Sequence, residues 1–185
     1  MTHRASRFFF LATFGFFLLQ SAAAASLLTG EIYALRFADL DGRTFATNDR
    51  HVSVVVLTTR ADLAKAQLVG ARVPDYCLGN PEYRMITVVN FGRRYGPFAR
   101  AVASSVIRRR IDIEAAQLQR RYDARGIHKD ARRDVFVVPD FDGTIAQQLG
   151  AGPNAFRVFV FGRGGKLLRQ WSDIPSAVEL AAAVK

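Results

Sequence analysis

Cysteine and histidine are both scarce in this chain of 185 residues, which holds a single cysteine, Cys77, and three histidines at positions 3, 51 and 128. One thiol cannot close an internal disulfide, and no CxxC pair exists for dithiol chemistry or metal binding. So few histidines and one thiol also leave too little to build a zinc site of the usual His and Cys composition. We therefore predict no metal and no cofactor.

Acidic residues are also scarce. The chain has 16 Asp and Glu but 26 Lys and Arg, which gives a formal net charge of +10. Such an excess is compatible with a nucleic acid, an acidic lipid surface or an acidic protein as a partner, and it says nothing about the fold. The basic stretches carry no aromatic interleaving and no nucleic-acid-binding motif, so we predict no specific nucleic-acid binding.

The first 25 residues have the three parts of a secretory signal peptide. Basic residues precede an apolar run from Phe8 to Leu19, and an alanine-rich segment follows it. The run is shorter than the roughly 20 residues that span a bilayer, although an uncleaved membrane anchor is the alternative. We expect cleavage after Ala24 or Ala25, which leaves residues 26–185 as one domain that is periplasmic or secreted and has no stable membrane span.

The rest of the chain alternates strand-like and helix-like segments around the apolar run Val52–Leu57. This run is typical of a strand that is buried on both faces, as in sheets covered by helices. In chain order, we expect a hairpin over 31–45, strands over 52–57 and 84–91 with a helix over 62–69 between them, a long helix over 98–125, a strand over 134–140, a short helix over 142–150, a hairpin over 156–171 and a helix over 176–184.

The long helix combines an apolar stripe with many arginines. Its stripe consists of Ile107, Ile111, Leu118 and Tyr122, which predicts the face that packs on the core. We interpret the arginines as a solvated face that is partly paired with acidic residues; an anion-binding patch is the alternative. The arginines lie at positions 108–110, 120, 121, 125, 132 and 133, and the acidic residues are Asp112, Glu114 and Asp123.

The order of elements, together with three local motifs, resembles the thioredoxin-like superfamily, in the branch shared by exported thiol-disulfide oxidoreductases and peroxiredoxins. The motifs are FADLDGR at 37–43, VVPDFDGTIA at 137–146 and FVFGRGGKL at 159–167. The resemblance implies an α/β fold of three layers, in which helices flank a central mixed sheet preceded by a β-hairpin.

The chain departs from this superfamily where its redox chemistry lies. The superfamily places its cysteines at the start of the helix after the first core strand, but residues 60–65 hold none. Its cis-proline position, just before a later core strand, corresponds to Phe156, with Pro153 three residues earlier. The chain is closest in character to periplasmic thioredoxin-fold proteins without the CxxC pair, such as the YtfJ-like proteins.

Two functions follow from this resemblance. The first is a non-catalytic binding or assembly module, whose partner is a periplasmic protein or peptide held in the groove that lost its cysteines. The resemblance places this groove at Thr58, Thr59, Arg60, Asn154 and Phe156. Because Arg60 stands at the positive end of a helix dipole, we expect it to meet an anionic or carboxylate-bearing partner, unless it pairs with Asp62 or solvent.

The second function is a single-cysteine thiol redox enzyme, peroxidase-like or an oxidoreductase, that uses Cys77. It requires a cation near the thiol, such as Arg72 or Arg84, and a resolving thiol from another molecule. Cys77 lies in the loop-like segment 74–81, where a buried structural thiol is the simpler interpretation. No residue pattern predicts an oligomeric state.

Overall fold

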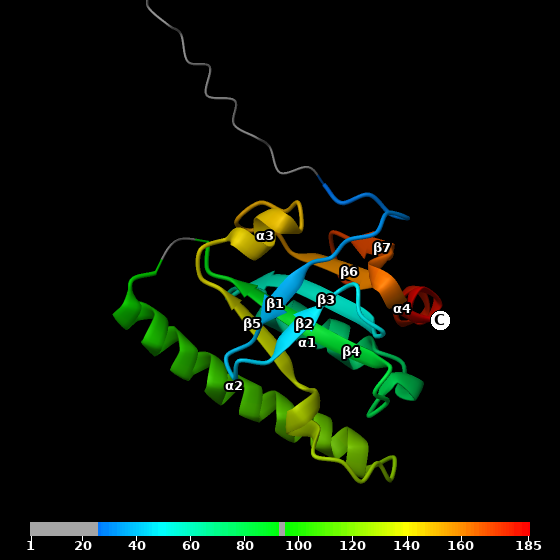
Figure 1. Ribbon diagram of the computed structural model, residues 1–185. Coiled ribbons are helices and arrows are strands. Elements are labelled where there is room, and N and C mark those ends of the chain that lie inside the picture. Colours follow the sequence, from blue (N-terminus) through cyan, green and yellow to red (C-terminus); the bar gives the residue numbers. More distant parts are fainter. Residues whose placement is uncertain (1–25, 93–94) are drawn as a thin grey trace, which may run out of the picture.

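The computed structural model describes residues 26–92 and 95–185 (Figure 1). The signal peptide predicted at residues 1–25 therefore lies outside the described residues. Within the described part of the chain, no helix is both long enough and apolar enough to cross a membrane.

A mixed sheet of five strands forms the centre of the domain, in the spatial order β5-β4-β3-β6-β7. The parallel strands β3, β4 and β5 form one side, and β6 and β7 continue it antiparallel. The middle strand β3 is buried from Ser53 to Thr58, as its apolar sequence predicts. The strand bounds are β3 Val52–Thr59, β4 Tyr83–Asn90, β5 Phe136–Asp140, β6 Arg157–Phe161 and β7 Leu167–Trp171.

The N-terminal hairpin is shorter than expected, because β1 covers only Arg36–Ala38 and β2 only Thr44–Ala46. The preceding residues run instead beside β7, where Ile32 bridges Lys166 and the Tyr33 N–H donates to the Gly165 carbonyl. This pairing occupies backbone groups that a longer hairpin would have used.

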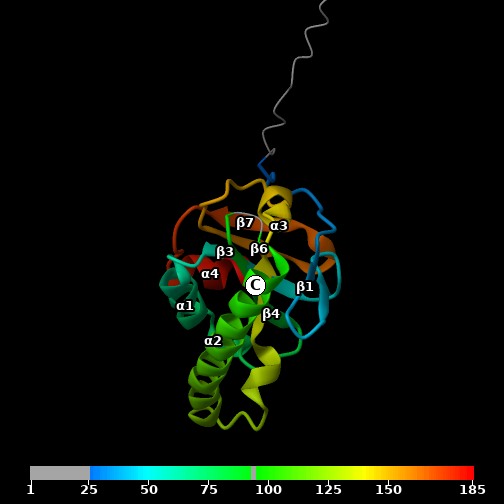
Figure 2. The same ribbon diagram turned by 90° about the vertical axis from the view of Figure 1, so that its left-hand side faces the viewer.

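Helices and the hairpin cover opposite faces of the sheet, as Figure 2 shows for α1 and β1. Helices α1 (Leu63–Arg72) and α4 (Ala177–Val184) pack on the face that presents Val54 and Val56, and α2 (Pro97–Asp123) covers Val89 and Val137 on that same face. The hairpin and the short helix α3 (Thr144–Gln148) cover the other face. Three 3-10 turns, Asp75–Cys77, Ala131–Asp134 and Arg163–Gly165, complete the chain. The predicted α/β arrangement in three layers is confirmed.

The predicted apolar stripe of α2 is confirmed as its core face. Ile107, Ile111 and Tyr122 are buried, and Leu118 packs beside them half-buried. Two of the three acidic residues pair with arginines as expected: Asp112 with Arg132 at 3.3 Å and Glu114 with Arg110 at 3.1 Å. Asp123 instead accepts a hydrogen bond from the Gln119 side chain at 2.9 Å, because that amide lies one helical turn away on the same side.

Candidate functional site

The turn after β3 holds its polar side chains in local hydrogen bonds. Thr58 is buried, and its hydroxyl donates to the Thr59 carbonyl at 3.2 Å. The Thr59 hydroxyl donates to the Asp62 carboxylate at 3.2 Å, and Lys65 pairs with the same carboxylate at 3.3 Å. Asp62 is thus engaged by its neighbours. The exposed Arg60 makes no ion pair within the described residues, so the Arg60–Asp62 pair considered above does not form.

The loop before β6 crosses the same end of the sheet. The Asn90 side-chain amide, at the end of β4, donates to the Pro153 carbonyl at 2.9 Å. Asn154 is exposed and lies beside Gly92, where an added Cβ would stand 3.7 Å from the Asn154 Oδ1. This places Asn154 by the end of β4, which pairs with β3 through Asn90 and Thr59.

Phe156 lies within the core. The β3–β6 register pairs Leu57 with Arg157, which puts Phe156 next to Thr58. Its ring is only 7% exposed, packs with Val54 and Val56 of β3, and lies under the Lys65 ammonium, 5.4 Å from the ring centroid. The structure therefore brings all five predicted groove residues to one end of the sheet, but Phe156 supports the loop from beneath and offers little surface to a ligand.

A hollow of about 340 Å³ opens beside Arg60, between α2 and strands β4 and β5. Its lining is mainly apolar, and Arg60, Arg110, Thr87 and Glu114 supply polar atoms at its margins. The floor is formed by Leu63, Val89, Phe91 and Val137, and the wall from α2 by Phe98, Ala99, Val102, Ala103, Val106 and Ile107.

The apolar wall of this hollow was missed at the level of the sequence. Phe98, Val102 and Val106 recur every fourth residue, which is a second stripe on the same helix as Ile107 and Ile111. Two apolar stripes on one helix indicate two surfaces to cover. That signal was present in the sequence, but nothing in it showed that the second stripe would border a hollow.

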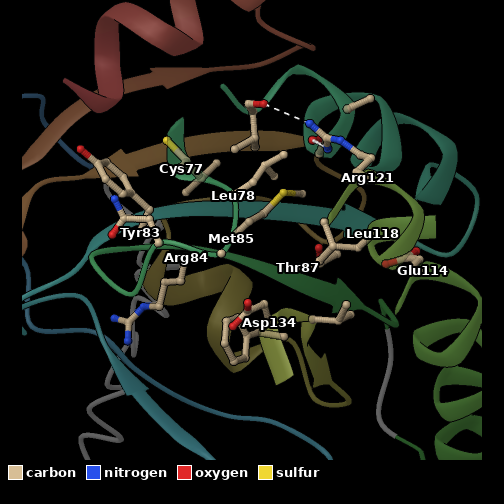
Figure 3. A pocket seen from close by; sticks show the side chains of 18 of the residues that line it. Cys77, Leu78, Tyr83, Arg84, Met85, Thr87, Glu114, Leu118, Arg121 and Asp134 are labelled. Atoms are coloured by element: carbon tan, nitrogen blue, oxygen red, sulfur yellow. Dashed lines mark hydrogen bonds between the residues drawn. The ribbon is translucent and has the colours of Figure 1, made fainter. Parts of the chain in front are cut away.

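A second cavity, of about 230 Å³, lies between α1 and α2 under the Cys77 turn. Figure 3 shows Met85 and Thr87 of β4 pointing into it, with Leu118 and Glu114 of α2 at one side. Thr87 and Glu114 also line the first hollow, so the two spaces meet at these residues. Burial raises the pKa of Glu114, and the Arg110 guanidinium opposes that shift.

Cys77 is a free, buried thiol. Burial raises the pKa of its thiol to about 11, so the thiol stays protonated at neutral pH. The two cations considered for its activation are held elsewhere. Arg72 donates to the Ile174 and Pro175 carbonyls, and Arg84 donates to Ser53 and pairs with Asp49 at 2.8 Å.

Solved structures with a similar fold are known, although the sequence itself has no match. No family model and no curated protein matches the sequence. Among solved structures, the exposed lipoprotein thioredoxin of Streptococcus pneumoniae strain TIGR4 matches with a TM-score of 0.52 at 12% identity, over 82% of this chain and 98% of that one. A candidate protein disulfide isomerase of Bacteroides thetaiotaomicron matches with a TM-score of 0.51 at 12% identity, over 85% of this chain and 86% of that one.

At this level of identity the likeness concerns the fold alone. It agrees with the element order, with the central mixed sheet and with the helices on its faces. None of the peptide bonds in the described residues is cis, including the one before Phe156. The chain has the thioredoxin-like fold, and its single cysteine leaves it without a dithiol site.

Proposed function

We propose that this protein is an exported, non-catalytic binding module that holds a polypeptide segment in the hollow beside Arg60. The observation that carries the proposal is an exposed arginine without an ion pair in the described residues, at the margin of a mainly apolar hollow of about 340 Å³. Arg60 and Phe91, which follow the carboxyl ends of β3 and β4, border the hollow, and open α/β sheets commonly bind ligands at such strand ends. Export follows from the pattern of residues 1–25.

The charges favour an occupant that carries a carboxylate next to an apolar side chain. Arg60 and Arg110 both border the hollow, and Glu114 already balances Arg110. Arg60 is left to meet an external anion, and it stands just before the positive end of α1. An apolar side chain of the partner would fill the space between Leu63 and the α2 wall.

Cys77 takes no part in this proposal. Its pKa is raised to about 11 by burial, and a redox cycle needs a thiolate and a second thiol. We expect no turnover in an insulin-reduction assay. Turnover that Cys77→Ser abolished would favour the single-cysteine enzyme instead.

Capture of a partner from the native periplasm, with matched variants, tests the hollow, which Arg60 alone of the five predicted groove residues lines. We expect Arg60→Ala to weaken capture without a measurable change in melting temperature, because exposed arginines contribute little to folding. Arg169→Ala is its control, since Arg169 is also exposed and without an ion pair but lies on β7.

A second pair of variants tests the apolar space itself. Ala103→Phe would fill the hollow, whereas Ala101→Phe adds the same ring to α2 away from the hollow. Ala103→Phe should reduce capture of the same partner and Ala101→Phe should not. If neither Arg60→Ala nor Ala103→Phe reduces capture, the hollow is not the binding site.

A further inference from the structure

Helix α2 carries a second apolar face, opposite the one that packs on the sheet. A helix on the surface of a domain is normally polar on its outer side. The outer side of α2 instead presents four large apolar side chains spaced by four and seven residues: Phe98, Val102, Val106 and Ile113, which are 83%, 51%, 59% and 45% exposed. Figure 1 shows this helix running along the outside of the domain.

Two arginines lie in line with this apolar row. Arg109 and Arg120 follow the helical period of the apolar row, are exposed, and make no ion pair within residues 26–92 and 95–185. The acidic residues of the helix have other partners: Asp112 pairs with Arg132, Glu114 pairs with Arg110, and Asp123 accepts a hydrogen bond from the Gln119 amide. The face therefore combines exposed apolar side chains with uncompensated arginines.

We propose that the outer face of α2 binds an anionic membrane surface, with the helix lying in the plane of the interface. Amphipathic helices bind membranes when apolar side chains enter the boundary of the acyl region and arginines meet the anionic headgroups. Phe98 and the valines supply the apolar side chains here, and Arg109 and Arg120 supply the cations. Removal of residues 1–25 takes away Arg4 and Arg7 and no acidic residue, so the exported protein keeps a net charge of +8, which adds attraction to the same surface.

A second copy of the chain fits this face less well. Arg109 lies midway between Phe98 and Arg120, so an antiparallel pair that overlaps over this whole row would oppose Arg109 to its own copy. A parallel pair would align both arginines with their copies. Either arrangement sets like charges against each other at an apolar contact, which is unfavourable.

Membrane binding requires neither Arg60 nor the floor of the hollow, but it shares part of the α2 wall with it. Phe98, Val102 and Val106 also form the outer wall of that hollow. A polypeptide held there would thus lie at the membrane surface. Arg60→Ala should leave membrane binding unchanged.

Flotation of the exported protein with vesicles tests the proposal. We expect binding to vesicles of equal parts phosphatidylglycerol and phosphatidylcholine, none to phosphatidylcholine alone, and a decline with added salt. Arg109→Gln combined with Arg120→Gln should weaken binding on the order of tenfold. Arg36→Gln combined with Arg169→Gln is the control, because it removes the same charge from exposed arginines of β1 and β7.

Tryptophan fluorescence tests insertion separately from charge. Phe98→Trp should shift its emission to shorter wavelength on anionic vesicles, whereas Val178→Trp, at a position 79% exposed on α4, should not. The native Trp171 is common to both variants. The proposal is overturned if anionic vesicles do not bind, if both arginine pairs weaken binding equally, if Phe98→Trp does not shift, or if sedimentation shows a dimer that Val102→Ser dissociates.

Discussion

The two halves of helix α2 differ in how the rest of the domain holds them. In the C-terminal half, Tyr122 is 1% exposed, donates to the Asp134 carboxylate at 2.6 Å and accepts from the Gly79 N–H at 3.0 Å. Arg121 donates to the Gly70 and Val73 carbonyls at the end of α1. In the N-terminal half, Phe98 is 83% exposed and borders a hollow.

The C-terminal half of the helix therefore contributes to stability, and the N-terminal half offers a surface for binding. Side chains of the C-terminal half contact segments far away in the sequence. Arg121 and Tyr122 pair there with backbone groups at the end of α1 and in the Cys77 turn that would otherwise be left unpaired. The N-terminal half has apolar surface without a cover, and exposed apolar patches of this kind mark interaction sites. Substitutions in the two halves should therefore have different consequences.

The sharpest contrast comes from truncating one aromatic side chain in each half. Tyr122→Ala should lower the free energy of unfolding by about 3 to 5 kcal/mol, because it leaves a cavity in the core. Phe98→Ala should change it by less than about 0.5 kcal/mol, because its ring is mostly in solvent. Denaturant unfolding of both variants measures the difference. Equal losses would mean that the N-terminal half is anchored as firmly as the C-terminal half.

A smaller change separates the hydrogen bonds of the Tyr122 hydroxyl from the packing of its ring. Tyr122→Phe keeps the ring but removes the hydroxyl between Asp134 and Gly79, and should cost about 1 to 3 kcal/mol, because the half-buried Gly79 N–H loses its acceptor and Asp134 keeps only Lys129 among the described residues. Tyr33→Phe is a comparison at the surface, since that hydroxyl accepts an exposed hydrogen bond from Leu28. A loss no larger than for Tyr33→Phe would show that packing of the ring alone anchors this half.

The Cys77 turn, which adjoins the anchored half, should show its burial in a pH titration. A thiol with a pKa of about 11 instead of the ordinary 9.0 is about 100-fold poorer in thiolate near neutral pH, so alkylation should be slowed at least that much. Because the pKa of the Cys77 thiol is higher in the folded than in the unfolded protein, the stability that the protonated thiol contributes is complete below pH 9. This contribution is lost as the pH rises through about 11. Cys77→Ala should remove that part of the decline, and alkylation as fast as that of a free thiol would refute the burial.

The smallest effects are expected from the arginines between the two halves. Arg108→Gln and Arg109→Gln should each change the free energy of unfolding by less than about 0.5 kcal/mol, as for exposed charges generally. Arg110→Gln should cost more, on the order of 1 kcal/mol, because it removes the partner of the half-buried Glu114. Chemical denaturation of the three single variants measures these differences in the free energy of unfolding. Unfolding by all three together would mean that this face is structural.

Much of the fold could be predicted because its signals are local. The apolar run at Val52–Leu57 predicted the buried strand, and the stripe through Ile107 and Ile111 predicted the core face of α2. The hairpin was predicted too long, because residues 31–33 pair with the turn before β7, far away in the sequence. Strand partners of that kind leave no local trace.

The candidate site could be predicted only in part, for a similar reason. The turn at Thr58 to Arg60 follows a recognisable strand, so its position at a strand end could be inferred. The burial of Phe156 could not, because an aromatic residue in a loop has no periodicity that shows which side of the sheet it joins. The hollow was missed because its floor and wall come from four separate elements.

The sequence by itself determined that the protein has no dithiol site, since one cysteine cannot form a pair in any fold. It also determined that α2 carries two apolar stripes, because helical spacing is fixed by the backbone. Only the tertiary structure decided that the second stripe, at Phe98, Val102 and Val106, stays open, because burial depends on the surface that another element presents. It likewise decided that Cys77 is held as a protonated thiol, since desolvation by surrounding side chains raises its pKa.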